Sequence, residues 1–131
     1  MVIDGSALLA ILADRPERRT LEDAIAADPV RLVSAVTRLS ASLTMITRHG
    51  PEGALRLDQL LNEIGATIAP FDEPQGALAL KAFERFGEGR HPAALDLPSC
   101  AAYALSVSEA EQLLFTGGGF AMTDVDAMRG Q

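Results

Sequence analysis

The hydrophobic positions of this chain fall into short apolar runs that alternate with longer amphipathic segments. The first run, residues 1–3, stops at Asp4, and the small pair Gly5-Ser6 separates it from a second run. A short apolar run, small residues and a longer run are typical of a buried strand, a tight turn and a helix. We therefore expect Asp4 at the carboxyl end of a strand, the edge at which open α/β sheets bind ligands.

Further strands and helices follow in alternation. Strands are predicted at residues 1–4, 30–33, 67–70 and 112–115, and residues 122–125 are a candidate edge strand. Helices are predicted at residues 5–13, from Leu21 to about Asp28, and at 34–49, 51–64, 73–86 and 98–107. This alternation predicts an α/β fold, a three-layer α/β/α domain around a four- or five-stranded, mostly parallel sheet. A single domain over residues 1–131 is the simplest organisation, with a frayed tail at 126–131.

Three of these helices have apolar stripes, which in the commoner case face the core of the domain. The apolar helices between residues 5 and 25 and between 36 and 64 are also candidate surfaces for a partner. The stripe of the helix after Ser34 consists of Val36, Leu39, Leu43 and Ile46. That of the next helix consists of Leu55, Leu57, Leu60, Leu61 and Ile64, and that of helix 73–86 of Leu78, Ala82 and Phe86.

Composition narrows the functional classes. Hydrophobic residues make up 48% and charged residues 22%, which is typical of a globular chain. The net charge of -7 argues against a general nucleic-acid coat protein but not against a nuclease, because a metal ion inverts the field at a carboxylate cluster. The single cysteine, Cys100, forms no internal disulfide, and no apolar run approaches the ~20 residues of a membrane span. Together with the lack of a signal-peptide pattern, this predicts a soluble cytoplasmic protein.

Six segments carry a family resemblance. They are VIDGSALLAI (2–11), RLVSAVT (31–37), FGEGRHPAALDL (86–97), CAAYAL (100–105), LLF (113–115) and FAMTDV (120–125). In this order and spacing they resemble VapC-type toxins of the PIN-domain family. The resemblance implies an endoribonuclease that uses Mg²⁺ or Mn²⁺, forms a homodimer and is inhibited by a VapB-like antitoxin.

Acidic residues from four places hold the metal in that family, and most are missing here. Asp4 matches the first acid, Ser40 and Ser99 stand where the second and third are expected, and Gly119 or Gly118 stands at the fourth. Mg²⁺ and Mn²⁺ are hard cations that need several oxygen ligands to replace their hydration. One carboxylate and two hydroxyls should therefore bind them weakly or not at all.

Two further departures concern nearby residues. Gly5 stands where the family usually has a threonine or serine. Asp96, Asp124 and Asp126 are the acids that could substitute for the missing ligands, although Asp96 is also placed to cap the helix that follows it.

Other signals are weaker. The candidates for contact with RNA are Arg90, His91 and Ser6. The alternative for Arg90 and His91 is that they lie in a solvated loop. Lys81 and Arg85 share one helical face and could extend that patch or simply face solvent. The run 117–119 is more consistent with a flexible loop than with a phosphate cradle.

Two functional hypotheses remain open. The first is a ribonuclease with catalytic Asp4 and residual metal binding. The second is a binding protein that has lost cleavage, by natural change or by engineering, and retains recognition of antitoxin, RNA or a second copy of itself.

Overall fold

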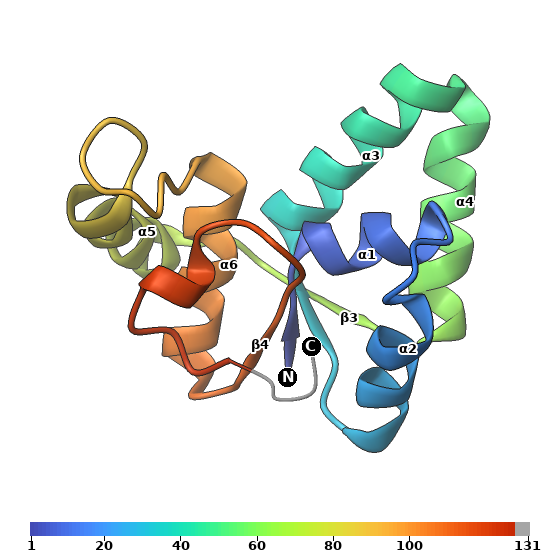
Figure 1. The fold of residues 1–131 in the computed structure, drawn as a ribbon, viewed down its shortest axis with the longest axis horizontal. Coiled ribbons are helices and arrows are strands. Elements are labelled where there is room, and N and C mark those ends of the chain that lie inside the picture. The colour runs from blue at the N-terminus through green and yellow to red at the C-terminus, as the bar shows by residue number, and fades with distance from the viewer. Residues whose placement is uncertain (128–131) are drawn as a thin grey trace.

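Four parallel strands form the centre of the computed structural model, which describes residues 1–127 (Figure 1). Strands β1 (Val2–Ile3), β2 (Leu32–Ser34), β3 (Thr67–Ala69) and β4 (Leu113–Leu114) lie in the order β3-β2-β1-β4. All three pairings are parallel. The predicted α/β fold with a parallel sheet is confirmed.

Helices cover both faces of the sheet (Figure 1). The helices are α1 (Gly5–Leu12), α2 (Arg18–Ala27), α3 (Ala35–His49), α4 (Pro51–Glu63), α5 (Glu73–Phe86) and α6 (Leu97–Glu109). Successive strand residues point to opposite faces. Ile3 and Leu114 therefore join a core with α1, α2 and α4, whereas Val2 and Leu113 join a second core with α5 and α6.

The candidate edge strand at 122–125 was wrong. The chain instead forms a 3-10 helix, η1 (Phe120–Met122), because Phe120 is buried against Phe115 with ring centroids 5.2 Å apart. Leu113 pairs further along, with its N–H donating to the Asp126 carbonyl and a bridge to Ala127. The rest of the tail expected to fray lies outside the described residues.

For the apolar stripe of α3, the core-facing alternative was wrong. The buried residues are Thr37, Ala41 and Met45, whereas Leu39, Leu43 and Ile46 are 61%, 55% and 41% exposed. On this face α3 packs closely against α4 at Met45. A Cβ atom on Gly53 of α4 would lie only 2.3 Å from the Met45 carbonyl oxygen.

The other two stripes are largely confirmed. Leu57, Leu60 and Leu61 of α4 are buried, as are Ala82 and Phe86 of α5. The exception is Leu55, which is 62% exposed and lies on the outer side of α4.

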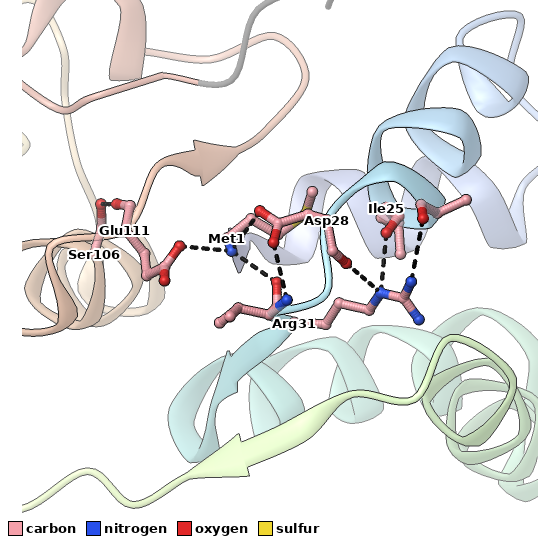
Figure 2. Close-up of polar contacts among 8 residues, drawn as sticks. Met1, Ile25, Asp28, Arg31, Ser106 and Glu111 are labelled. Carbon is pink, nitrogen blue, oxygen red and sulfur yellow. Dashed lines mark hydrogen bonds and ion pairs between the residues drawn. The ribbon is translucent and has the colours of Figure 1, made fainter.

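Charged groups fix the start of β1 (Figure 2). The Met1 ammonium donates to Asp28 Oδ2 at 2.9 Å, to the Val30 carbonyl at 2.7 Å and to Glu111 Oε2 at 2.8 Å. Arg31 donates to backbone carbonyls at the ends of α2 and α4. These contacts join the α2–β2 and α6–β4 connections to β1, and so position the sheet edge that follows it.

Within residues 1–127, no helix combines the length and the apolarity that a membrane crossing requires.

Candidate functional site

Asp4 follows β1 directly and caps α1. Its Oδ2 accepts the Ser6 N–H at 3.0 Å, and the residue is only 8% exposed. Burial raises the pKa of the Asp4 carboxyl above its ordinary value, hydrogen bonds from Ser6 and Gly5 oppose this, and the Asp96 charge adds to it. The carboxylate is therefore held in place but poorly solvated.

Two cavities meet at Asp4. The loop cavity, of about 440 Å³, lies against the 117–119 loop, and the helix cavity, of about 280 Å³, lies against α3. Asp4, Ser6 and Ser99 line both cavities. Ser40 lines the helix cavity, and Gly118 and Gly119 line the loop cavity. The fold thus gathers the positions that match the four acids of the family, although not Asp124 or Asp126.

The acids that line these cavities are Asp4 and Asp96. Asp96 Oδ1 accepts the Ser99 N–H at 3.0 Å, so it caps α6. Among residues 1–127, no group of three or more His, Cys, Asp or Glu side chains is arranged to share a metal ion. Mg²⁺ prefers octahedral oxygen coordination and gives up its water reluctantly. The donor set therefore does not fit the divalent ion that the family resemblance implies.

The other candidate acids lie away from both cavities. Asp124 forms an ion pair with Arg85 at 3.1 Å, and its Oδ1 accepts the Tyr103 hydroxyl at 2.5 Å. These partners lower the pKa of Asp124, whereas burial, followed by Asp124 itself, raises the pKa of Tyr103 to about 12. Asp124 therefore fastens the C-terminal segment to α5 and α6, and Asp126 lines neither cavity.

Hydroxyl groups dominate the wall of the helix cavity formed by α3. Thr37, Ser40 and Thr44 all line it, and the buried Thr37 Oγ1 has no hydrogen-bond partner within the described residues. A Cβ atom on Gly5 would lie 3.8 Å from Thr37 Cγ2, an ordinary contact. The position where the resemblance expects a threonine or serine therefore adjoins a buried hydroxyl that lacks a partner.

The glycine loop distinguishes between the two positions proposed for the fourth acid. A Cβ atom on Gly119 would lie 1.8 Å from the Ala93 carbonyl oxygen, so a side chain there would displace the backbone. Gly118 has open space around it but a φ of +70°. Asp and Asn are among the residues that tolerate this left-handed conformation best. An acid is therefore accommodated at Gly118 more readily than at Gly119.

The RNA-contact candidates are separated by the fold. Arg90 Nε donates to the Glu84 carbonyl at 3.3 Å, and His91 Nδ1 accepts the Ala93 N–H at 3.0 Å. Neither residue lines the two cavities, whereas Ser6 lines both. Of the three candidates, only Ser6 reaches the site.

Cys100, at the start of α6, is buried. Burial, followed by nearby carboxylates, raises the pKa of its thiol to about 11. The thiol is protonated at neutral pH and is a poor nucleophile.

Sequence reasoning missed two arginines that reach the same edge. Arg15 and Arg48 line a third cavity of about 310 Å³ beside Ser6 and Gly117. They lie 33 positions apart, and no local pattern links them, so only the three-dimensional arrangement shows their proximity.

Comparison with known proteins agrees with this architecture. The sequence model of the PIN domain matches residues 1–124. Ribonuclease VapC of Mycolicibacterium smegmatis is 41% identical over 128 residues, covering 98% of this chain and 99% of the relative. The chain belongs to the VapC ribonuclease family of PIN-domain proteins. Ribonuclease VapC30 of Mycobacterium tuberculosis is 36% identical over 125 residues and covers 95% of each chain.

Two solved structures share the fold. VapC20 of Mycobacterium tuberculosis, described as a sarcin–ricin loop cleaving toxin, has a TM-score of 0.76 at 16% identity and covers 98% of both chains. A toxin–antitoxin complex from Klebsiella pneumoniae has a TM-score of 0.72 at 15% identity, covering 99% of this chain and 97% of that one. The resemblance stated from the sequence is thereby confirmed, and the PIN fold with it.

Proposed function

We propose that this VapC-family chain is the toxin-like partner of an antitoxin and is impaired in metal-dependent RNA cleavage. The observation that supports the impairment is the composition of the site. The edge that gathers Asp4, Ser40, Ser99 and Gly118 offers the carboxylates of Asp4 and Asp96, and its other side chains are hydroxyl-bearing or apolar. Bound Mg²⁺ or Mn²⁺ would supply an activated water and charge neutralisation at phosphate, and this edge lacks the ligands to hold either ion.

The environment of the two acids supports the same conclusion. Asp4 is buried with a raised pKa, and one of its oxygens is already used by the Ser6 amide. Asp96 uses one oxygen to cap α6. Both carboxylates therefore have structural roles that reduce what remains for an ion.

Recognition is the activity that we propose survives. The exposed row Leu39, Leu43 and Ile46 on α3 gives the chain an apolar surface beside the site. Exposed apolar patches often mark interfaces. By analogy with the family, we propose an antitoxin, a second copy of the chain and RNA as partners, in the cytoplasm, with residues 1–131 as a single domain.

An RNA cleavage assay with Mn²⁺ tests the impairment. It compares the parent chain, Asp4→Ala and a restored variant that carries Ser40→Glu, Ser99→Asp and Gly118→Asp, with the Mycolicibacterium smegmatis relative as positive control. We expect no Asp4-dependent cleavage by the parent and a gain of cleavage in the restored variant. Cleavage by the parent that Asp4→Ala abolishes would overturn the proposal.

A displaced control separates site chemistry from added charge. It carries Thr47→Glu, Ser108→Asp and Gly89→Asp, which add the same side chains on α3, at the end of α6 and at an open glycine. Gly89 has a φ of +76°, and a Cβ atom added there would meet nothing within 4 Å, so it matches Gly118 in backbone strain. The displaced control is expected to remain inactive.

A further inference from the structure

The cavity that contains Arg15 and Arg48 lies between α1, the end of α3 and the 117–119 loop. We call it the arginine cavity. Arg15 follows α1, where its N–H donates to the Ala10 carbonyl at 3.0 Å, and Arg48 lies in the last turn of α3. Ser6, Thr116 and Gly117 form the wall nearest the sheet edge. Elements far apart in the sequence thus bring two cations to one hollow.

The guanidinium groups of Arg15 and Arg48 are not neutralised in the part of the chain that the structure describes. Neither one takes part in a hydrogen bond or ion pair there, whereas Arg31, Arg38 and Arg85 all do. The single acid that lines the arginine cavity is Glu17, and it forms no ion pair with either of them. Two unpaired cations therefore share one cavity of a chain whose net charge is -7.

The arginine cavity adjoins the candidate site. Ser6 lines all three cavities, and Thr116 and Gly117 are shared with the loop cavity. Ser6 Oγ accepts the Thr116 N–H at 3.1 Å, which fixes this shared wall. An extended ligand could therefore have one group between the arginines and a neighbouring group beside Asp4.

We propose that Arg15 and Arg48 bind a phosphodiester of single-stranded RNA and hold the adjoining nucleotide at the Asp4 edge. This inference rests on the proposed function, because RNA is the ligand class of the family to which the chain belongs. Guanidinium groups match phosphate oxygens in geometry and charge. A nucleotide alternates one charged phosphate with neutral hydroxyls and base edges. That alternation matches one cationic cavity followed by cavities lined by Ser6, Ser40 and Ser99.

An acidic peptide fits the same surface less well. Its second carboxylate would approach Asp4 and Asp96, and the helix cavity offers it hydroxyls but no further cation. The neutral sugar and base of a nucleotide avoid this repulsion. The observations therefore favour RNA.

The experiment measures fluorescence anisotropy of a labelled single-stranded RNA oligonucleotide in EDTA, so that no metal contributes to binding. Arg15→Gln and Arg48→Gln are compared with the parent, and Arg19→Gln and Arg56→Gln are the matched controls. The control residues are exposed cations outside the arginine cavity. We expect each cavity variant to weaken binding about tenfold. Each variant should also reduce the slope of log K against the logarithm of the salt concentration by about 0.7. The controls should change affinity by less than about twofold.

Three results would overturn the proposal. The first is an equal loss of RNA affinity in the cavity variants and the control variants, which would indicate diffuse electrostatic attraction. The second is no RNA binding by the parent, and the third is displacement of RNA by a polyglutamate peptide as effectively as by unlabelled RNA. Because the assay excludes metal, its result is independent of whether the cleavage assay supports the impairment. Thermal melts of the variants check that each one is folded.

Discussion

For the restored variant we predict a change in melting temperature on metal binding that can be measured without any RNA substrate. It adds three carboxylates to an edge that already holds Asp4 and Asp96. Without metal, these like charges repel, so we expect a lower melting temperature than in the displaced control. The cost of a non-glycine residue in the left-handed conformation, about 1–2 kcal/mol, falls on both variants, because Gly118 and Gly89 have similar φ values of +70° and +76°. The difference between them therefore reports the clustering of charge.

Adding Mn²⁺ should reverse this difference. An ion present at about 100 times its dissociation constant stabilises the folded state by about 2.7 kcal/mol. The unfolding entropy of a chain of 131 residues is about 0.3 kcal/mol per degree near the midpoint. The restored variant should therefore gain about 10 °C in melting temperature. The parent and the displaced control should shift by no more than about 1 °C, because neither has the donor set.

Differential scanning fluorimetry over a Mn²⁺ titration measures these shifts. A saturable rise in the parent that matches the restored variant and is lost in Asp4→Ala would refute the argument from the donor set. A folded restored variant that shows no rise would refute a different step, because positions 40, 99 and 118 would then not converge on Asp4 closely enough to share an ion.

Three further predictions concern the scaffold. Gly53→Ala should lower stability by about 2 kcal/mol in urea melts, because its Cβ would lie 2.3 Å from the Met45 carbonyl oxygen; an unchanged midpoint would contradict the close packing of α3 and α4. Gly76→Ala should instead raise stability by about 0.5–1 kcal/mol in the same melts, because the helix gains propensity and the nearest atom to its Cβ would be 3.9 Å away. The hydrogen bond from the Met1 ammonium is the chief cause that lowers the pKa of Asp28. The ionised Asp28 therefore stabilises the fold above the unfolded pKa of about 3.9, and this stabilisation is lost as the pH falls through the lower folded pKa. Urea melts of Asp28→Asn between about pH 2 and 6 should therefore converge with those of the parent at the acid end, and a constant difference would count against this ion pair.

Much of the scaffold could be predicted from the sequence because its signals are local. An apolar run that ends at Asp4, followed by small residues, allows little except a strand, a turn and a capped helix. Parallel strands then bring their carboxyl ends to one edge, so the convergence of Ser40 and Ser99 on Asp4 follows from topology. The substitution of the acids rests on the family resemblance at those positions and stays a prediction.

What escaped prediction depends on how closely elements approach. The stripe rule assigns Leu39 and Leu43 to the core because they follow the apolar spacing of a helix. The helix instead buries Thr37, Ala41 and Met45, and it packs closely against α4 at Met45. Pairwise steric contact, such as that between Gly119 and the Ala93 carbonyl oxygen, likewise has no trace in the sequence.

The hydroxyl of Ser6 accepts the amide hydrogen of Thr116 while its residue borders three hollows at once. This one hydrogen bond thus connects α1 to the chain that leads into the 117–119 loop. Movement of the 117–119 loop would change the shape of all three cavities together. A ligand bound in one cavity would therefore alter the affinity of a neighbouring cavity for a second ligand, without direct contact between the two ligands.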